Sequence, residues 1–548
     1  MYQYQQHYST RETPQSQPIP GKDMVRGRAG GHVFALDDWG RLDRFLILGS
    51  SAPTYYASAK ELTVENADAV ARCIKEDGVR VVNRIIQISE AGRAPKNDPA
   101  LFALAMCAGM GGDATRKTAL NALSRVARIG THLFTFLNYV LAFRGWGRGL
   151  RNAVASWYND KGIEQLSYQV IKYRQRVGWT HRDALRVSHP KTSDEARNNL
   201  YKWITGKEIN FATDAIHVLI EAFEMVQSTT SKRDVVELIE SHNLPREAIP
   251  TQWLTEPEVW AALFERMPMT AMIRNLATMT RIGLIAPMSD AAQRVCNELR
   301  DEHRIRKARV HPIQVLIAMT TYQQGRGVRG QNTWEPVSQV VDALDDAFYL
   351  SFGNVESTGK RVVLALDVSG SMTIGGVAGV VGLTPRVASA AMAMVTARCE
   401  PNHTIVAFAD RMIPLSVSPR QRLDDVVRSV SDLPFRGTDC ALPMMWALGY
   451  NTKATGYWDG GEYEKVKDGV VEADAFVVLT DNETWAGAIH PSQALQRYRH
   501  ETGIPAKLVV CGMASNGFSI ADPEDGGMLD VVGMDAATPQ IISDFIRG

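Results

Sequence analysis

Three oxygen-bearing side chains alternate with single residues directly after an apolar run: Asp367, Ser369 and Ser371. At this spacing a carboxylate and two hydroxyls can turn their oxygens toward one point, and oxygen ligands suit a hard cation such as Mg²⁺. Two later loops can complete the set, because Thr438 offers a hydroxyl and Asp481 ends another apolar run. We therefore expect these five residues to bind one divalent cation, Mg²⁺. Under the competing interpretation they are cap and turn residues.

A second pattern mixes cations with aromatic rings in residues 101–207, which hold 17 Lys and Arg against 6 Asp and Glu. Cations can neutralise phosphates, and aromatic rings can stack on unpaired bases. The density of the pattern therefore favours a nucleic-acid ligand. The candidate nucleic-acid-binding residues are Arg148, Arg151, Lys172, Arg174, Arg176, His181, Arg182, Arg186 and His189.

Members of this basic cluster also have a purely structural interpretation. Trp157, Tyr173 and Trp179 can anchor the packing of helices. His181 can cap or pack a helix, and the arginines can simply be solvated. The cluster as a whole, more than any one member, carries the prediction of a nucleic-acid ligand.

The chain lacks three signatures of hydrolases and nucleotide-binding enzymes, GxxxxGK[ST], HExxH and GxSxG. A metal set rich in hydroxyls and poor in carboxylates fits one structural cation better than a pair of ions that cuts phosphodiesters. We therefore expect a binding protein and not an enzyme.

The elements that must position the metal set begin near residue 360. Four apolar runs rich in β-branched residues are typical of parallel strands buried on both faces. Helical patterns separate them, which predicts a doubly wound α/β domain after a hinge at 357–359. Ligands of such sheets lie at the carboxyl ends of strands, where Asp367 and Asp481 stand. The runs occupy 361–367, 404–410, 474–481 and 507–513.

The basic cluster belongs to a different region. From about 56 to 353, apolar positions recur every three or four residues in segments separated by short breaks. Such a long series predicts a solenoid of degenerate helix pairs. The net charge of zero hides an asymmetry, because 1–360 carries +7 (45 basic, 38 acidic) and 361–548 carries −7 (15 basic, 22 acidic). Residues 1–28, rich in Gln, Ser and Pro, predict a disordered leader.

Cysteine usage and the start of the chain suggest a compartment. The 548 residues include six scattered cysteines without a CxxC pair, which fits reduced thiols. No apolar run approaches the roughly 18 residues of a membrane span, and the N-terminus lacks a signal-peptide pattern. We expect a cytoplasmic protein without a membrane partner.

Long ordered stretches from residue 29 to the end resemble the Ro autoantigen family of TROVE-module RNA-binding proteins. The metal set itself resembles the metal-ion-dependent adhesion site of von Willebrand factor type A domains. Residues 1–28 would be a leader, 29–356 the TROVE module and 357–548 the von Willebrand A-like domain. The stretches that carry the resemblance include WGRGLRNAVASWYND (146–160), KYRQRVGWTHRDALRVSH (172–189), HPIQVLIAMTTYQQGRG (311–327) and VVLTDNETWAG (477–487).

The resemblance implies a fold and partners. The fold would be a monomeric ring of HEAT-like helical repeats closed by a von Willebrand A-like domain. Small noncoding Y-like RNAs would bind its outer surface, and single-stranded ends of misfolded structured RNAs would enter the central hole. Lys172, Arg176 and His189 align with RNA contacts of the family, while the other basic candidates are added for their charge.

The resemblance also bears on protein partners. Bacterial members work with a 3′-to-5′ exoribonuclease through a Y-like RNA, and no motif in this chain tests that partner. The alternative function is a protein-binding adaptor, in which an acidic side chain of the partner completes the metal shell.

Overall fold

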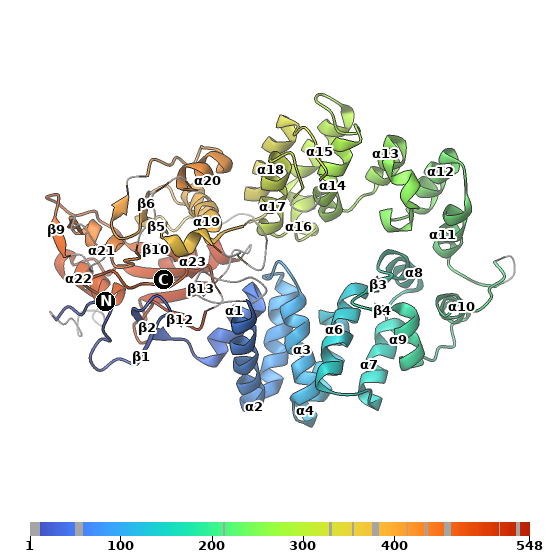
Figure 1. Ribbon diagram of the computed structural model, residues 1–548, viewed down its shortest axis with the longest axis horizontal. Coiled ribbons are helices and arrows are strands. Elements are labelled where there is room, and N and C mark those ends of the chain that lie inside the picture. Colours follow the sequence, from blue (N-terminus) through green and yellow to red (C-terminus); the bar gives the residue numbers. More distant parts are fainter. Residues whose placement is uncertain are drawn as a thin grey trace.

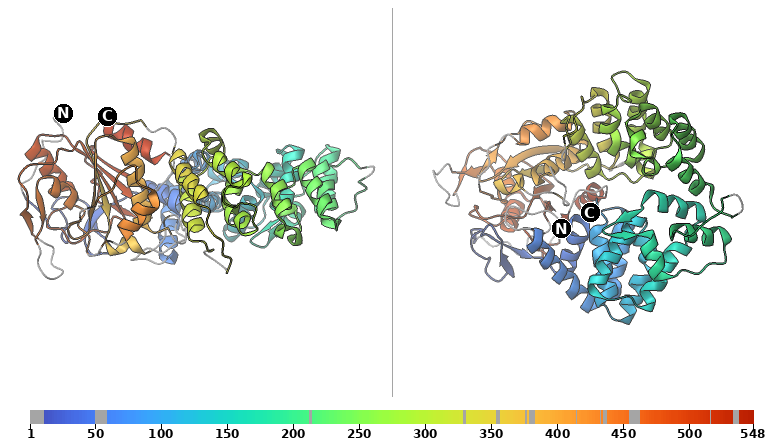
Figure 2. Two further views of the ribbon diagram at one scale, coloured as in Figure 1. Left: turned by 90° about the horizontal axis from the view of Figure 1, so that it is seen from above. Right: turned by 45° about the vertical axis from the view of Figure 1, so that its right-hand side comes forward.

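The structure is a computed structural model that describes residues 11–49, 59–211, 214–327, 331–352, 356–374, 377, 383–413, 415–431, 433, 437–453, 462–514, 516–532 and 537–548. A curved array of helices and an α/β domain together make a ring (Figure 1). Figure 2 shows the α/β domain at one end of the molecule and the middle of the helical array, in green and cyan, at the other. Within the described residues, no helix is long and apolar enough to cross a membrane.

The helical array follows the chain around the ring, as its apolar periodicity predicts. Polar caps define where helices begin: Ser231, Ser289 and Asp301 each accept a hydrogen bond from the backbone N–H three residues on. The longer helices are α1 (Asp38–Leu48), α2 (Ala59–Ala91), α3 (Asp98–Met110), α4 (Asp113–Asn121), α6 (Gly130–Phe143), α7 (Arg148–Asn159), α8 (Ile163–Lys172), α9 (His181–Ser188), α10 (Glu195–Ile204), α11 (Val218–Ser228), α12 (Lys232–His242), α13 (Pro257–Glu265), α14 (Met269–Arg281), α15 (Asp290–Leu299), α17 (Pro312–Gln323) and α18 (Ser338–Leu350). The short ones are α5 (Leu123–Val126) and α16 (Glu302–Lys307).

The α/β domain has a six-stranded sheet in the order β13-β11-β10-β5-β6-β7, parallel except for β7. This confirms the doubly wound fold. Its strands are β5 (Val362–Asp367), β6 (His403–Phe408), β7 (Met412–Ile413), β10 (Ala475–Thr480), β11 (Lys507–Gly512) and β13 (Met528–Val532). Its helices are α19 (Pro385–Cys399), α20 (Leu423–Ser431), α21 (Leu442–Ala447), α22 (Pro491–Thr502) and α23 (Thr538–Arg547).

Alternate residues of the buried strands pack on opposite faces of the sheet. Leu364 joins the core beneath α19, α20 and α23, which is continuous with the core of the helical array. Val363 joins a second core beneath α21 and α22. Helices therefore cover both faces, and the carboxyl ends of β5 and β10 open at one edge.

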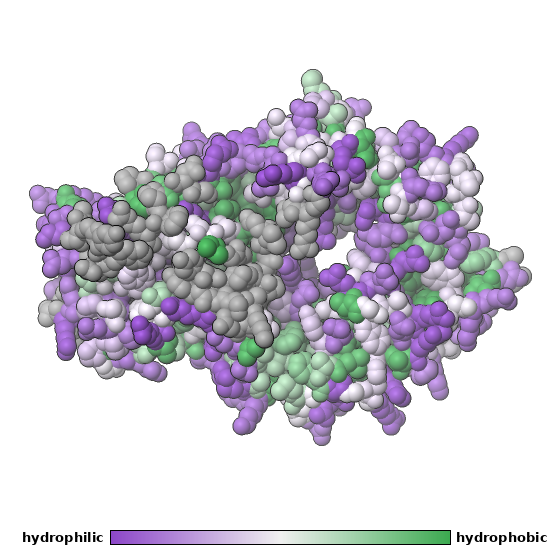
Figure 3. Space-filling model, in the orientation of Figure 1, coloured by the Kyte–Doolittle hydropathy of each residue, from purple (hydrophilic) through white to green (hydrophobic). Residues whose placement is uncertain are grey.

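Both ends of the helical array bind the α/β domain. Arg44 of α1 donates to Asp530 of β13 at 2.6 Å, and Arg422 forms an ion pair with Asp342 of α18. The two ends also meet directly, because the Arg309 guanidinium donates to the carbonyl of Glu90 at 3.0 Å. These contacts close the ring, and an opening through it is visible in the space-filling view (Figure 3).

The structure corrects the prediction of a disordered leader for residues 11–28, and residues 1–10 lie outside the described residues. Residues 11–28 lie against the α/β domain, and strand β1 (Met24–Arg26) pairs with β2 (His32–Ala35), which pairs with β12 (Phe518–Ser519). Gln15 is fully buried. The polar composition predicted disorder, but polar side chains such as Gln15 form hydrogen bonds with buried groups of a domain far away in the sequence. No local sequence pattern encodes such a contact.

Candidate functional site

The predicted metal set lies at the carboxyl edge of the sheet. Asp367 ends β5, and Asp481 directly follows the neighbouring parallel strand β10. Ser369 donates its backbone N–H to Asp367 Oδ1 at 2.9 Å, and its hydroxyl lies 3.1 Å from that of Ser371. The Ser371 hydroxyl also lies close to the carboxylate of Asp481 and favours its charged form. The structure therefore brings these four side chains together.

Thr438 joins this edge through its loop. The backbone N–H groups of Trp485 and Ala486 both donate to the carbonyl of Thr438 at 3.0 Å, which ties its loop to the segment after Asp481. The side chains of all five predicted ligands are buried, and none is more than 4% exposed.

The two carboxylates of the set carry an electrostatic cost. Burial raises the pKa of Asp367, and burial together with the nearby Asp367 charge raises the pKa of Asp481 well above its usual range. A divalent cation would relieve both effects, and two carboxylates with hydroxyls suit a hard ion. The chemistry of the donors thus fits Mg²⁺.

Three residues outside the predicted set lie beside it, and two of them, Thr480 and Arg386, donate hydrogen bonds to it. Thr480 donates its hydroxyl to Asp367 Oδ2 at 2.6 Å, and the Arg386 guanidinium donates to the carbonyls of Val368 and Ser369. The third, Glu483, is buried, and burial raises its pKa to about 7. Thr480 and Glu483 flank Asp481 in the sequence, so their place beside a strand end could have been predicted, whereas Arg386 is 19 residues beyond Asp367 and carried no such signal.

The basic cluster centres on a small hairpin beside the opening. Strands β3 (Gln175–Arg176) and β4 (Trp179–Thr180) pair across a two-residue turn, which lies near α6 and α8 on the inner side of the ring (Figure 1). Val177 and Gly178 have φ of 45° and 80°, the left-handed conformation that such tight hairpin turns require. The turn holds Arg176 at the hairpin's surface.

Most of the predicted RNA-binding side chains are exposed and unpaired. Six arginines and His189 are exposed. Within the part of the chain that the structure describes, no carboxylate forms an ion pair with any of these arginines; Arg174 instead lies over the ring of Phe223, 5.3 Å from its centroid. The six arginines are Arg148, Arg151, Arg174, Arg176, Arg182 and Arg186.

Lys172 and His181 differ from the rest of the cluster. Lys172 is half-buried, and its ammonium donates to the Tyr168 hydroxyl at 3.0 Å. His181 is 4% exposed, its Nδ1 lies 2.8 Å from the Tyr158 hydroxyl, and burial lowers its pKa to about 3. As a buried neutral ring it cannot reach a surface ligand, so the prediction that it contacts RNA is wrong.

The aromatic rings divide between core and surface. Trp157 is fully buried and its indole donates to the carbonyl of Ala127, which confirms that it anchors helix packing. Trp179 is half-buried and lies 5.9 Å from the ring of Trp146. Rings at the hairpin therefore remain partly accessible.

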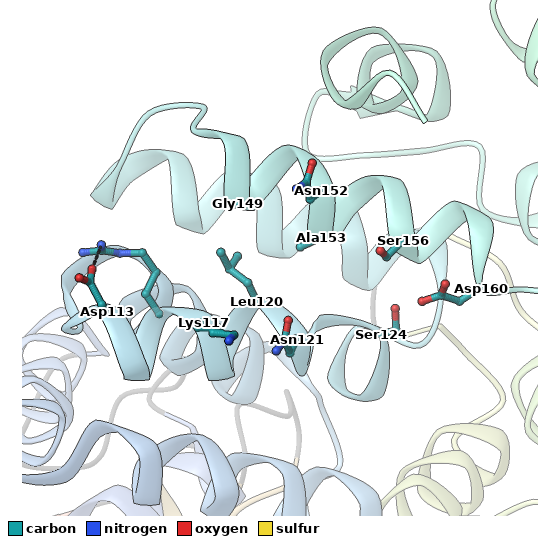
Figure 4. A pocket seen from close by; sticks show the side chains of 11 residues that line it. Asp113, Lys117, Leu120, Asn121, Ser124, Gly149, Asn152, Ala153, Ser156 and Asp160 are labelled. Atoms are coloured by element: carbon teal, nitrogen blue, oxygen red, sulfur yellow. Dashed lines mark hydrogen bonds and ion pairs between the residues drawn. The ribbon is translucent and has the colours of Figure 1, made fainter. Parts of the chain in front are cut away.

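A groove of about 540 Å³ lies between α4 and α7, and two of the residues that line it, Gly149 and Asn152, adjoin Arg148 and Arg151 in the sequence (Figure 4). Lys117, Asn121 and Asn152 line it, and Arg116 at its end pairs with Asp113 at 2.9 Å.

Comparisons with known proteins cover nearly the whole chain. The TROVE domain matches residues 25–321, and the Ro60 vWA domain matches residues 361–455 and 467–546. The RNA-binding protein RO60 of Deinococcus radiodurans is 40% identical over 98% of this chain and 97% of its own length. The RNA-binding protein RO60 of Caenorhabditis elegans is 34% identical over 96% of this chain and 90% of its own length.

A solved structure agrees with these relatives. The crystal structure of the Deinococcus radiodurans RO (RSR) protein superposes with a TM-score of 0.69 at 41% identity, covering 93% of this chain and 99% of that one. The relatives are named as RNA-binding proteins. The chain has a TROVE domain followed by a Ro60 vWA domain, and it is 40% identical to a relative over 98% of its length. The chain therefore belongs to the Ro60 family.

Proposed function

We propose that this chain binds RNA as a ribonucleoprotein scaffold, and that its ligands are small noncoding Y-like RNAs and the single-stranded ends of misfolded structured RNAs. The observation that carries the proposal is the set of six exposed arginines without carboxylate partners among the described residues. Like charges kept close together without counterions destabilise a fold, so a polyanionic ligand is their natural complement.

The hairpin suits unpaired RNA in particular. Its strands β3 and β4, which carry the exposed Arg176 and the half-buried Trp179, lie beside the opening of the ring (Figure 1). A single strand offers both phosphates and stackable bases, whereas a duplex hides its bases. We place this RNA quality control in the cytoplasm, where a 3′-to-5′ exoribonuclease would act on the captured ends.

A comparison of matched RNAs tests this proposal. A misfolded RNA with a single-stranded 3′ tail should bind more tightly than the same RNA with a blunt end, and a Y-like RNA should compete for the outer surface. Equal affinity of the tailed and blunt RNAs would contradict capture of single-stranded ends.

We further propose that Asp367, Ser369, Ser371, Thr438 and Asp481 hold one divalent cation, Mg²⁺. Bound there, the ion would compensate two buried carboxylates and support the loops at the strand ends. The closed arrangement of the ligands favours this structural role over the alternative adaptor function, because a partner's carboxylate would have to reach side chains that are at most 4% exposed. Calorimetric titration with Mn²⁺, with Asp367→Ala as the comparison, tests the site.

A further inference from the structure

Residues 11–35, here called the N-terminal strap, cross the carboxyl edge of the sheet. Backbone hydrogen bonds attach the strap to the loop after Asp481, since Gln15 N–H donates to the carbonyl of Gly487 at 2.9 Å. Farther along, the backbone N–H of Ala29 donates to the carboxylate of Glu483 at 2.8 Å. The strap therefore contacts the metal-site loop at two points.

Gln15 bridges two loops that carry metal ligands. Its side-chain amide donates to Asp439 Oδ1 at 2.7 Å and to the carbonyl of Ile489 at 2.9 Å. Its carbonyl oxygen accepts a hydrogen bond from the hydroxyl of Thr484. Asp439 adjoins Thr438, and Thr484 lies three residues after Asp481, so one fully buried amide holds both loops together.

The strap and these loops lie so close together that two glycines at their contacts leave no room for a side chain. A Cβ on Gly31 would lie 1.8 Å from the carbonyl oxygen of Thr484. A Cβ on Gly487 would lie 2.1 Å from the Gln15 amide nitrogen and 2.3 Å from Asp439 Oδ1. Such spacing shows that the strap and both loops are packed as one unit, in which a shift of one segment must displace the others.

We propose that the N-terminal strap is part of the metal centre, with Gln15 as a positioning residue that sets Thr438 and Asp481 at the distance needed to share one cation. The inference rests on the metal site proposed above. Groups that orient metal ligands affect affinity although they do not touch the ion.

Thermodynamic linkage couples docking of the strap to binding of the metal. If the strap favours metal binding, the metal must stabilise the docked strap by the same factor. Mn²⁺ should therefore slow hydrogen exchange at the backbone amides of Gln15 and His32, both of which donate hydrogen bonds at the strap.

The test uses the full chain and two variants that cut the same bridge from opposite sides. Gln15→Ala and Thr484→Val should each weaken Mn²⁺ binding about tenfold or more in calorimetric titration. The double variant should lose less than the product of the two single effects, because both remove one interaction. Glu12→Ala is the matched control: it breaks the surface ion pair of the strap with Arg497 but leaves Gln15 in place.

The outcomes separate the strap from the metal site. Wild-type affinity in both bridge variants, with unchanged circular dichroism, would overturn the role of the strap alone. A wild-type chain that binds no Mn²⁺ would remove the metal centre, and this inference with it. If Gln15→Ala unfolds, Thr484→Val and the exchange protection by Mn²⁺ in the wild type decide the question.

Discussion

Arginines are used in opposite ways in two regions of the molecule, the α/β domain and the surface formed by α7, the β3–β4 hairpin and α9. In the α/β domain Arg499 is buried and pairs with Asp525 at 2.6 Å, and Arg361 pairs with Asp474 at 2.7 Å. On α7, the β3–β4 hairpin and α9, arginines are exposed, and within the described residues no carboxylate pairs with them. Paired charges hold structure together, whereas a cluster of unpaired charges costs stability through repulsion. The difference indicates that the first set serves the fold and the second serves a ligand.

The largest expected effect that would test this difference is the salt dependence of RNA affinity. If each of the six exposed arginines contacts one phosphate, affinity should fall roughly 10³-fold between about 50 and 200 mM KCl, because bound counterions are released from the RNA. Fluorescence anisotropy with a tailed RNA at constant Mg²⁺ measures this. A flat plot of log affinity against log salt would show that the unpaired arginines do not contact phosphate, and would contradict their assignment to a ligand.

A double substitution of Lys172 and Arg176 by Ala should weaken RNA binding by roughly tenfold for each lost contact and lower the salt slope by about 2. The matched control is Arg420→Ala with Arg428→Ala, which removes two exposed charges from the α/β domain. The control should keep wild-type affinity. Because Lys172 is half-buried, circular dichroism must show normal helicity; unchanged RNA affinity in a folded double variant would place the RNA elsewhere.

The sequence predicted the parts of this molecule that local chemistry determines. Apolar runs that end in Asp367 and Asp481 identified two strands and the edge at which their polar ends meet. The excess of cations in residues 101–207 identified the exposed arginines, because unpaired charges stay at the surface.

Two errors have different physical origins. His181 is buried with Ala184, Leu185 and Ser188, at helical spacings of three, four and seven, so its burial was present in the periodicity but was outweighed by its charge. The burial of Gln15 was not predictable in this way. Its partners lie more than 400 residues away in the chain, and only the folded ring brings them together.

A smaller effect, on the pH dependence of stability, distinguishes the buried His181 from the exposed arginines. The pKa of His181 is about 3 in the folded chain and about 6.5 in the unfolded chain. Between these two pH values the unfolded state therefore binds more protons than the folded state. Stability should therefore fall as the pH drops below 6.5, by about 2 kcal/mol from His181 alone at pH 5. Thermal melts at pH 7.5 and pH 5 should show this loss, and His181→Gln should reduce it. If the stability of wild type and His181→Gln changes equally with pH, His181 is not a buried neutral ring and could contact RNA at the surface.

The smallest expected effect concerns the two sites together. Asp367→Ala should abolish Mn²⁺ binding but change RNA affinity less than about twofold, because charge screening at physiological salt acts over about 8 Å and the substituted residue is buried in another domain. The ion pairs that join the domains, such as Arg44 with Asp530, do not involve the metal ligands. A large loss of RNA affinity in a folded variant would mean that the strand-end loops help set the width of the ring. The metal centre would then affect RNA affinity by changing how the ring closes. In that case the α/β domain would contribute to RNA binding as well as to the fold.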